Sequence, residues 1–105
     1  MRLKLAHFTL FAGLLASHFA LAANPEAAKS TAANICAGCH GAKGISSAGS
    51  FPNLAGQKAE YLVAQMKAFR DKTRANPVMS GMASSLKDEE IANLAAYYAG
   101  LKACE

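Results

Sequence analysis

Residues 36–40 read Cys36-Ala37-Gly38-Cys39-His40, and the rest of the chain is organised around this stretch. The order is C-x-x-C-H, the attachment sequence of a c-type haem. Two thiols at this spacing can each form a thioether with one vinyl group of the same porphyrin, and the histidine that follows can bind the iron. The stretch therefore predicts one covalently bound haem c, with Cys36 and Cys39 as its thioether residues and His40 as an axial ligand of the iron.

The first 22 residues have the pattern of a secretory signal peptide. Arg2 and Lys4 provide a positive start, residues 5–21 are almost wholly apolar or small, and residues 20–22 form a small-x-small cleavage site. The apolar run is shorter than the roughly 20 residues that a membrane span needs. We therefore expect export to the periplasm, and the alternative is a membrane anchor that is not removed.

We expect cleavage after Ala22 or Ala23, which leaves residues 23–105 as one small domain without a transmembrane span. Loss of Arg2 and Lys4 lowers the formal net charge from +4 to +2, and the two propionates of a haem would bring it near zero. The domain has no basic cluster with interleaved aromatic residues, so nucleic acid is not expected as a partner. A domain of this size has a hydrophobic core that gives only marginal stability by itself, and a buried haem would add to that core.

Other cysteine chemistries fit the sequence poorly. His7 and His18 lie in the leader, so a structural zinc site would need every remaining histidine and cysteine at once, namely Cys36, Cys39, His40 and Cys104. A thioredoxin-like redox pair needs a βαβ setting, and the chain has no strand pattern. Cys104 lies outside the haem motif, where it is either an incidental exposed thiol or the site of a disulfide to a partner or to a second copy of the chain.

Hydrophobic periodicity predicts an all-α domain with three main helices and irregular loops. The first helix begins at Asn24-Pro25-Glu26, where asparagine can cap and proline suits the first turn, and it runs through Ile35 into the haem motif. The second runs from Gln57 or Lys58 to about Asp71. The last runs from about Asp88 to Lys102.

Residues 41–50 and 72–85 are expected to be irregular, because glycine, serine or proline interrupts both segments. The second segment carries Met79 and Met82. With no second histidine in the domain, methionine is the common alternative for the other axial ligand. Met66 lies on an apolar helix stripe, where core packing is its expected role. Met79 and Met82 therefore stay open as alternatives on physical grounds.

Several stretches resemble the class I c-type cytochromes, most closely the small bacterial periplasmic monohaem members and single domains of the dihaem ones. The resemblance covers essentially the whole mature chain. The stretches that carry it are residues 36–40, Phe51-Pro52-Asn53-Leu54-Ala55-Gly56-Gln57, Tyr61-Leu62, Asn76-Pro77-Val78-Met79 and Leu94-Ala95-Ala96-Tyr97. It implies a small cytochrome c fold that wraps around one haem. It also implies Met79 as the second axial ligand, with Met82 as the runner-up, and a Pro52 carbonyl that accepts a hydrogen bond from His40 Nδ1–H.

The resemblance further implies that the first and last helices cross, with Tyr97 packed over a small residue such as Ala28 or Ala32. The chain departs from the family pattern at Lys87, because members often place serine or threonine at this cap position. Asp88 could cap the last helix instead, which would shift the helix start by one residue.

A haem iron held by histidine and methionine is six-coordinate and has no open position for substrate, so we expect an electron carrier rather than an enzyme. Its expected partners are redox proteins of a respiratory chain: a membrane or periplasmic donor and an oxidase or reductase acceptor. Gln57 and Arg74 are polar residues near the expected pocket, and either could hold a haem propionate. Two alternatives stay open. One is a haem-based ligand-binding or peroxidase-like protein with a weak sixth ligand, and the other is an interaction subunit tethered through Cys104 or an uncleaved leader.

Overall fold

The computed structural model describes residues 22–104 of the chain. The leader prediction concerns residues 1–21, which lie outside this range, so the cleavage site stays a prediction. Within the described residues all regular secondary structure is helical, and loops and turns connect the helices. The elements are α1 (Pro25–Thr31), the π-helical segment η1 (Ala32–Cys36), α2 (Ala37–His40), α3 (Ala59–Arg70), α4 (Pro77–Ala83) and α5 (Asp88–Ala99). The expected all-α class is confirmed.

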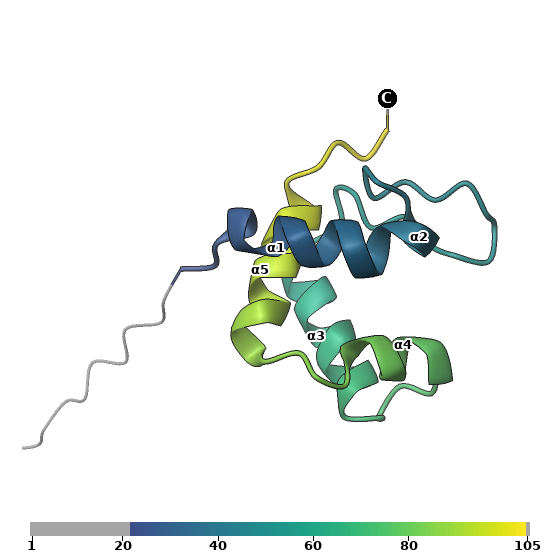
Figure 1. Ribbon diagram of the computed structural model, residues 1–105, viewed down its shortest axis with the longest axis vertical. Helices are drawn as coiled ribbons and strands as arrows, with labels where there is room; N and C mark the ends of the chain where they lie inside the picture. The colour runs from purple at the N-terminus through teal and green to yellow at the C-terminus, as the bar shows by residue number, and fades with distance from the viewer. Residues whose placement is uncertain (1–21, 105) are drawn as a thin grey trace, which may run out of the picture.

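The first and last helices cross and pack against each other, as Figure 1 shows for α1 and α5. Ala28 and Ala32 are small enough to let α5 approach closely, and they share one buried cluster with Leu94, Ala95 and Tyr98 of α5 and Leu62 of α3. Tyr98 is the tyrosine buried within this cluster, whereas Tyr97 is half-buried and packs against it. A polar contact ties the same two ends, because the Asn24 N–H donates to the buried Asn93 Oδ1 at 2.7 Å.

The prediction that residues 72–85 are irregular is wrong in the middle of this segment, where α4 forms. Asn76 caps this helix, since its Oδ1 accepts a hydrogen bond from Met79 N–H at 3.0 Å, and Pro77 occupies the first helical position. The Asn-Pro pair is therefore a helix start here, as it also is at Asn24-Pro25. Gly81 is tolerated inside so short a helix at a modest cost.

The helix α5 begins at Asp88 as predicted, but its cap alternative and its predicted end are wrong. Lys87, not Asp88, is the N-cap residue, and its backbone N–H donates to Glu90 Oε2 at 2.8 Å. The Glu90 carboxylate thus satisfies the backbone N–H of the cap residue, while the Lys87 side chain makes no capping hydrogen bond of its own. The helix ends at Ala99 rather than Lys102, because Gly100 takes the C-cap position.

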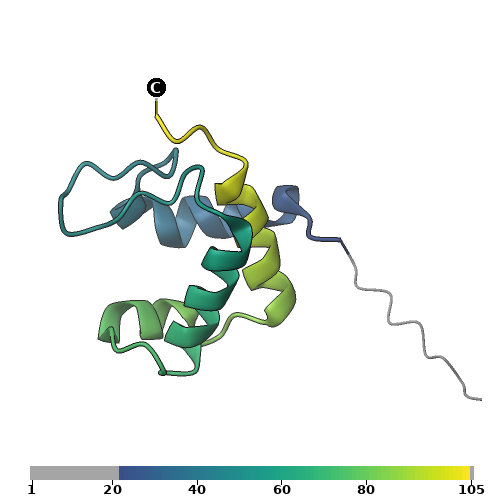
Figure 2. The same ribbon diagram turned by 180° about the vertical axis from the view of Figure 1, so that it is seen from behind.

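The interior contains few large side chains. The buried hydrophobic residues of the described chain are Ala28, Ala32, Ala55, Leu62, Phe69, Ala83, Ile91, Leu94, Ala95 and Tyr98, and half of them are alanines. In both views α2 and α4 project from the same side of α3, one near each of its ends (Figures 1 and 2). The space between these projections is where the candidate site lies.

Candidate haem site

A cavity of about 450 Å³ lies among α2, α3, α4 and α5. Its lining includes both cysteines and the histidine of the C-x-x-C-H stretch, from η1 and α2, and Met79 and Met82 from α4. Most of the remaining lining is apolar, including Leu62, Phe69 and Leu94. A cavity of this volume falls in the ~300–1,000 Å³ range of pockets that hold cofactors.

The exposed hydrophobic residues show what kind of body the cavity suits. The large hydrophobic side chains exposed among residues 22–104 are Ile35, Phe51, Tyr61, Val78 and Met82, at 40–59% exposure. All of them line this one cavity. Apolar side chains gathered around a hollow mark a binding site rather than ordinary surface. A flat apolar group in the cavity would cover them and complete a core that is otherwise rich in alanine, so the residues present fit a haem.

His40 is held in place by contacts within the protein. The ring is 8% exposed, and its Nδ1 lies 2.8 Å from the Pro52 carbonyl oxygen. Because a carbonyl only accepts, Nδ1 carries the proton and donates, which leaves Nε2 as the nitrogen for a metal. The edge of Phe51 packs near the same ring, with centroids 6.4 Å apart. The backbone then turns sharply at Gly41, whose φ of +85° suits glycine.

The two thiols of the stretch lie in different surroundings. Cys36 is half-buried at the end of η1, whereas Cys39 is exposed on α2, and neither is in a disulfide. Burial raises the pKa of the Cys36 thiol, and a hydrogen bond with Tyr98 offsets part of this rise. Burial also raises the pKa of Tyr98, with Cys36 as a further cause. The direction for Cys36 applies to a free thiol, because a thioether sulfur does not titrate.

Met79 and Met82 both reach the cavity from α4. Met79 is half-buried and its backbone N–H is held by Asn76, whereas Met82 is 47% exposed. Met66 of α3, expected to pack in the core, is half-buried and lines the cavity too. The structure thus brings His40, Met79, Met82 and Met66 to one cavity.

Gln57 and Arg74 both line the cavity, and each has a protein partner. Gln57 Oε1 accepts a hydrogen bond from the Lys58 N–H at 2.8 Å. Arg74 Nη1 donates to Gln65 Oε1 at 2.8 Å, and its guanidinium lies 4.6 Å from the centroid of the Phe69 ring. A guanidinium has five N–H donors, so Arg74 keeps donors for an anionic group.

Tyr98 was not identified as a site residue from the sequence. It lies on the apolar face of α5 predicted from periodicity, and it lines the cavity beside Cys36. Its position in the helix stripe carries no signal that separates a core tyrosine from one whose hydroxyl reaches a cysteine. The tertiary fold alone brings these two groups together.

Across residues 22–104 the structure gathers no group of three or more histidine, cysteine, aspartate or glutamate side chains that could hold a metal ion. In the same part of the chain, no helix is both long and apolar enough to cross a membrane.

Comparison with known proteins gives a consistent picture. Residues 25–102 match the sequence model of a family described as cytochrome c. The chain is 43% identical over 81 residues to cytochrome c4 of Pseudomonas aeruginosa, covering 77% of this chain and 40% of that protein. It is 43% identical over 103 residues to the thiosulfate dehydrogenase electron acceptor of Thiomonas intermedia, covering 97% of this chain and 45% of that protein.

The fold has solved counterparts as well. The structure of Acidithiobacillus ferrooxidans cytochrome c4 superposes with a TM-score of 0.68 at 33% identity, over 75% of this chain and 50% of that one. The chain thus spans half the length or less of these relatives.

Proposed function

The chain belongs to the cytochrome c family, and from that premise we propose that it is a single-electron carrier whose haem iron is held by His40 and Met79. One observation carries the proposal. A single apolar cavity is lined by both thiols of the attachment sequence, by a buried histidine and by a methionine on a separate helix. The cytochrome c family is one of electron-transfer proteins.

A covalently bound haem c supplies a one-electron redox centre. Cys36 and Cys39 would hold the group permanently, so it is not lost when the protein exchanges partners. The Pro52 carbonyl orients His40 and makes Nε2 a better donor to the metal. The apolar lining from α3 and α5 keeps water from the iron, which with the methionine ligand favours a higher reduction potential.

Met79 is the preferred methionine because of where its backbone is held. Its N–H is bound by Asn76 at 3.0 Å, at the start of α4, and its side chain is less exposed than that of Met82. Arg74 is the preferred contact for a propionate, since its guanidinium lines the cavity and retains donors; Gln57 is the second. Pro52 acts only through His40.

The test uses the mature protein purified from the periplasm. Its intact mass should include one haem, and the ferric form should show the weak near-infrared band of methionine-ligated iron. Met79→Ala should abolish this band, whereas Met82→Ala should leave it in place. A wild-type protein without the band would overturn the His–Met assignment. It would favour the alternative function, a haem-based ligand binder or peroxidase-like protein. The observation that supports this alternative is that most of α4, which carries Met79, is exposed.

We also propose a location and partners. The predicted leader supports export to the periplasm, and a relative described as a thiosulfate dehydrogenase electron acceptor supports a redox enzyme as donor. The acceptor would be an oxidase or reductase of a respiratory chain. Cys104 is exposed and not in a disulfide within the described chain. A disulfide-linked dimer through this residue would appear as a doubled mass under non-reducing conditions.

A further inference from the structure

The segment that carries the methionine ligand, residues 71–87 between α3 and α5, has few buried contacts of its own. Ala83 is its buried residue, Met79, Ser80 and Leu86 are half-buried, and the others are exposed. A segment with so little burial opens at low free-energy cost unless something else holds it. The question is therefore what keeps α4 over the cavity.

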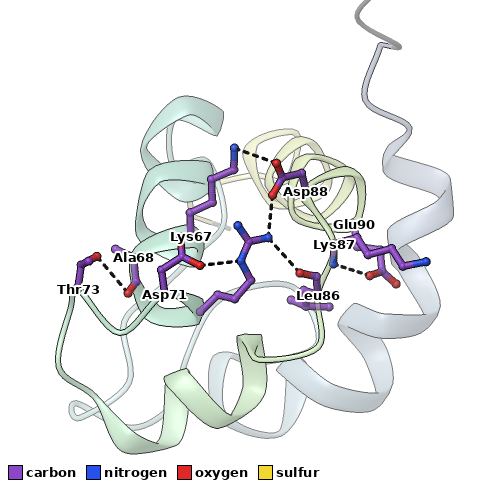
Figure 3. Close-up of polar contacts among 9 residues, drawn as sticks. Lys67, Ala68, Asp71, Thr73, Leu86, Lys87, Asp88 and Glu90 are labelled. Carbon is purple, nitrogen blue, oxygen red and sulfur yellow. Dashed lines mark hydrogen bonds and ion pairs between the residues drawn. The ribbon is translucent and has the colours of Figure 1, made fainter.

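Arg70, the last residue of α3, joins the two ends of this segment. Its Nη1 donates to the Leu86 carbonyl at 3.1 Å and to Asp88 Oδ1 at 2.7 Å, and its Nε donates to Asp71 Oδ1 at 3.1 Å (Figure 3). Lys67 Nζ adds a longer ion pair, 3.7 Å from Asp88 Oδ2. One guanidinium thus bonds the first residue of the segment, its penultimate residue and the first residue of α5.

The other polar contacts between α3 and this segment act on the beginning of the segment alone. The Thr73 hydroxyl and the N–H groups of Thr73 and Arg74 all bond to the Ala68 carbonyl. Arg74 bonds to Gln65. Among the described side chains, only Arg70 and Lys67 reach from α3 across to residues 86–88. The closure of the segment therefore depends on Arg70 more than on any other polar group.

We propose that Arg70 is a positioning residue for the methionine ligand: by bonding both ends of residues 71–87 it holds α4, and with it Met79, against the haem. The proposal rests on the proposed function, in which Met79 binds the iron. Joining two ends of a flexible segment removes part of the conformational freedom that opening would regain. The open form becomes rarer without any change at His40.

The geometry explains why arginine suits this position. Its planar fork can satisfy a carbonyl and two carboxylates together, whereas a lysine ammonium is a single point charge. The Arg70 side chain is 22% exposed, so this end of the pair is partly shielded from solvent. The Arg70 hydrogen bond, and then the charge of Lys67, hold the pKa of Asp88 below its ordinary value. The ion pair therefore stabilises the charged form of the Asp88 carboxylate, although the Asp88 side chain is well exposed.

The experiment measures how often Met79 leaves the iron in the haem-loaded protein. Imidazole binds the ferric iron only after the methionine has left, so its apparent affinity is proportional to the open fraction. Arg70→Gln should raise this affinity by roughly 3- to 10-fold, the range for a charge-assisted contact that is partly exposed. Arg70→Lys should recover part of the difference, and Asp88→Asn, which breaks the pair from the other end, should give a smaller rise.

Lys87→Gln is the matched control, because it removes one positive charge at the end of the same segment while the backbone contact to Glu90 is kept. Its imidazole affinity should equal that of the wild type. About 1 M salt, which reduces the Debye length to ~3 Å, should raise the imidazole affinity of the wild type more than that of Arg70→Gln, in which only the longer Lys67–Asp88 pair remains.

The outcomes separate the two proposals. A wild type without the near-infrared band, or one whose band survives Met79→Ala, overturns both the ligand assignment and the role of Arg70. A wild type with the Met79 band, in which Arg70→Gln and Asp88→Asn both behave like Lys87→Gln, overturns the role of Arg70 alone. If Arg70→Gln does not accumulate as folded protein, the Asp88→Asn result decides.

Discussion

The two sides of the haem cavity are built in different ways. On the His40 side, the proposed ligand directly follows Cys39, is buried, and donates to the Pro52 carbonyl. On the Met79 side, the proposed ligand lies on a short helix in a mostly exposed segment, and its position depends on an asparagine cap and on an arginine from another helix. One side is determined by local sequence, the other by tertiary contacts.

This difference predicts which of the two proposed ligands is released from the iron more easily. Breaking the His40 side requires disruption of the tight turn at Gly41, where the Ile45 carbonyl oxygen lies close against the glycine. Opening the Met79 side requires only that a lightly packed segment swings away. We therefore expect conditions or mutations that loosen the fold to release methionine first and to leave histidine bound.

The largest expected effect comes from replacing one glycine by alanine on each side of the cavity. A Cβ at Gly41, directly after His40, would overlap the Ile45 carbonyl oxygen, and the residue has a φ of +85° and a ψ of 150°. Gly41→Ala should cost about 3 kcal/mol or more in the free energy of unfolding, from strain and overlap together. Chemical denaturation of the haem-loaded protein measures this cost.

The same substitution on the Met79 side should have the opposite sign. A Cβ at Gly81 of α4 meets nothing within 4 Å, and alanine is the better helix former. Gly81→Ala should stabilise α4 by about 0.4–1 kcal/mol and lower the apparent affinity for imidazole. If Gly41→Ala is tolerated as well as Gly81→Ala, the two sides do not differ in the way described.

The second effect compares two helix caps with the same sequence. Asn76-Pro77 caps α4 and Asn24-Pro25 caps α1, each through an asparagine Oδ1 that accepts a backbone hydrogen bond. Asn76→Ala should weaken α4 by about 1 kcal/mol. The near-infrared band should then be lost at a lower imidazole concentration, by about fivefold, because Met79 is released more often.

Asn24→Ala is the matched control for this cap. It should cost a similar free energy of unfolding, because α1 packs on α5 in the core, while imidazole affinity stays at the wild-type value. Equal effects of both substitutions on imidazole affinity would show that the Met79 side is not an independently opening unit.

The helical fold was predictable wherever a stripe of apolar residues marked a buried face. Such stripes identified α3 and α5, and Asn24-Pro25-Glu26 identified the start of α1. Residues 77–83 have no comparable stripe, because α4 buries little beyond Ala83 and faces a ligand that the sequence does not contain. The helix was missed although Asn76-Pro77 has the same form as the cap that was recognised at α1.

The candidate site divides in the same way. Cys36, Cys39 and His40 are specified by spacing alone, since the chemistry needs them within five residues of chain. The contacts of Arg70 with Leu86 and Asp88 join residues 16 and 18 positions apart, and an arginine at a helix end is usually just a solvated charge. Only the folded chain shows that these groups meet.

The smallest expected effect is a loss of stability at low pH. Arg70 and then Lys67, both from α3, lower the pKa of Asp88 from its ordinary value of 3.8. A carboxyl group whose pKa is lower in the folded state stabilises that state above its ordinary pKa, and this stabilisation is lost as the pH falls through the folded value. Arg70 also bonds Asp71, and Glu89 and Glu90 share the first turn of α5 with Asp88.

The difference in urea midpoint between wild type and Asp88→Asn should therefore be constant from about pH 5 to 7, and it should shrink once the pH falls below 3.8. Because Asp88 is well exposed, the difference should also vanish at about 1 M salt. Glu89→Gln removes the same charge from the same turn without touching Arg70, so its midpoint should follow the wild type across this acid range. If Glu89→Gln and Asp88→Asn follow the same curve, the acid response comes from the helix dipole of α5 rather than from the arginine that closes the Met79 side.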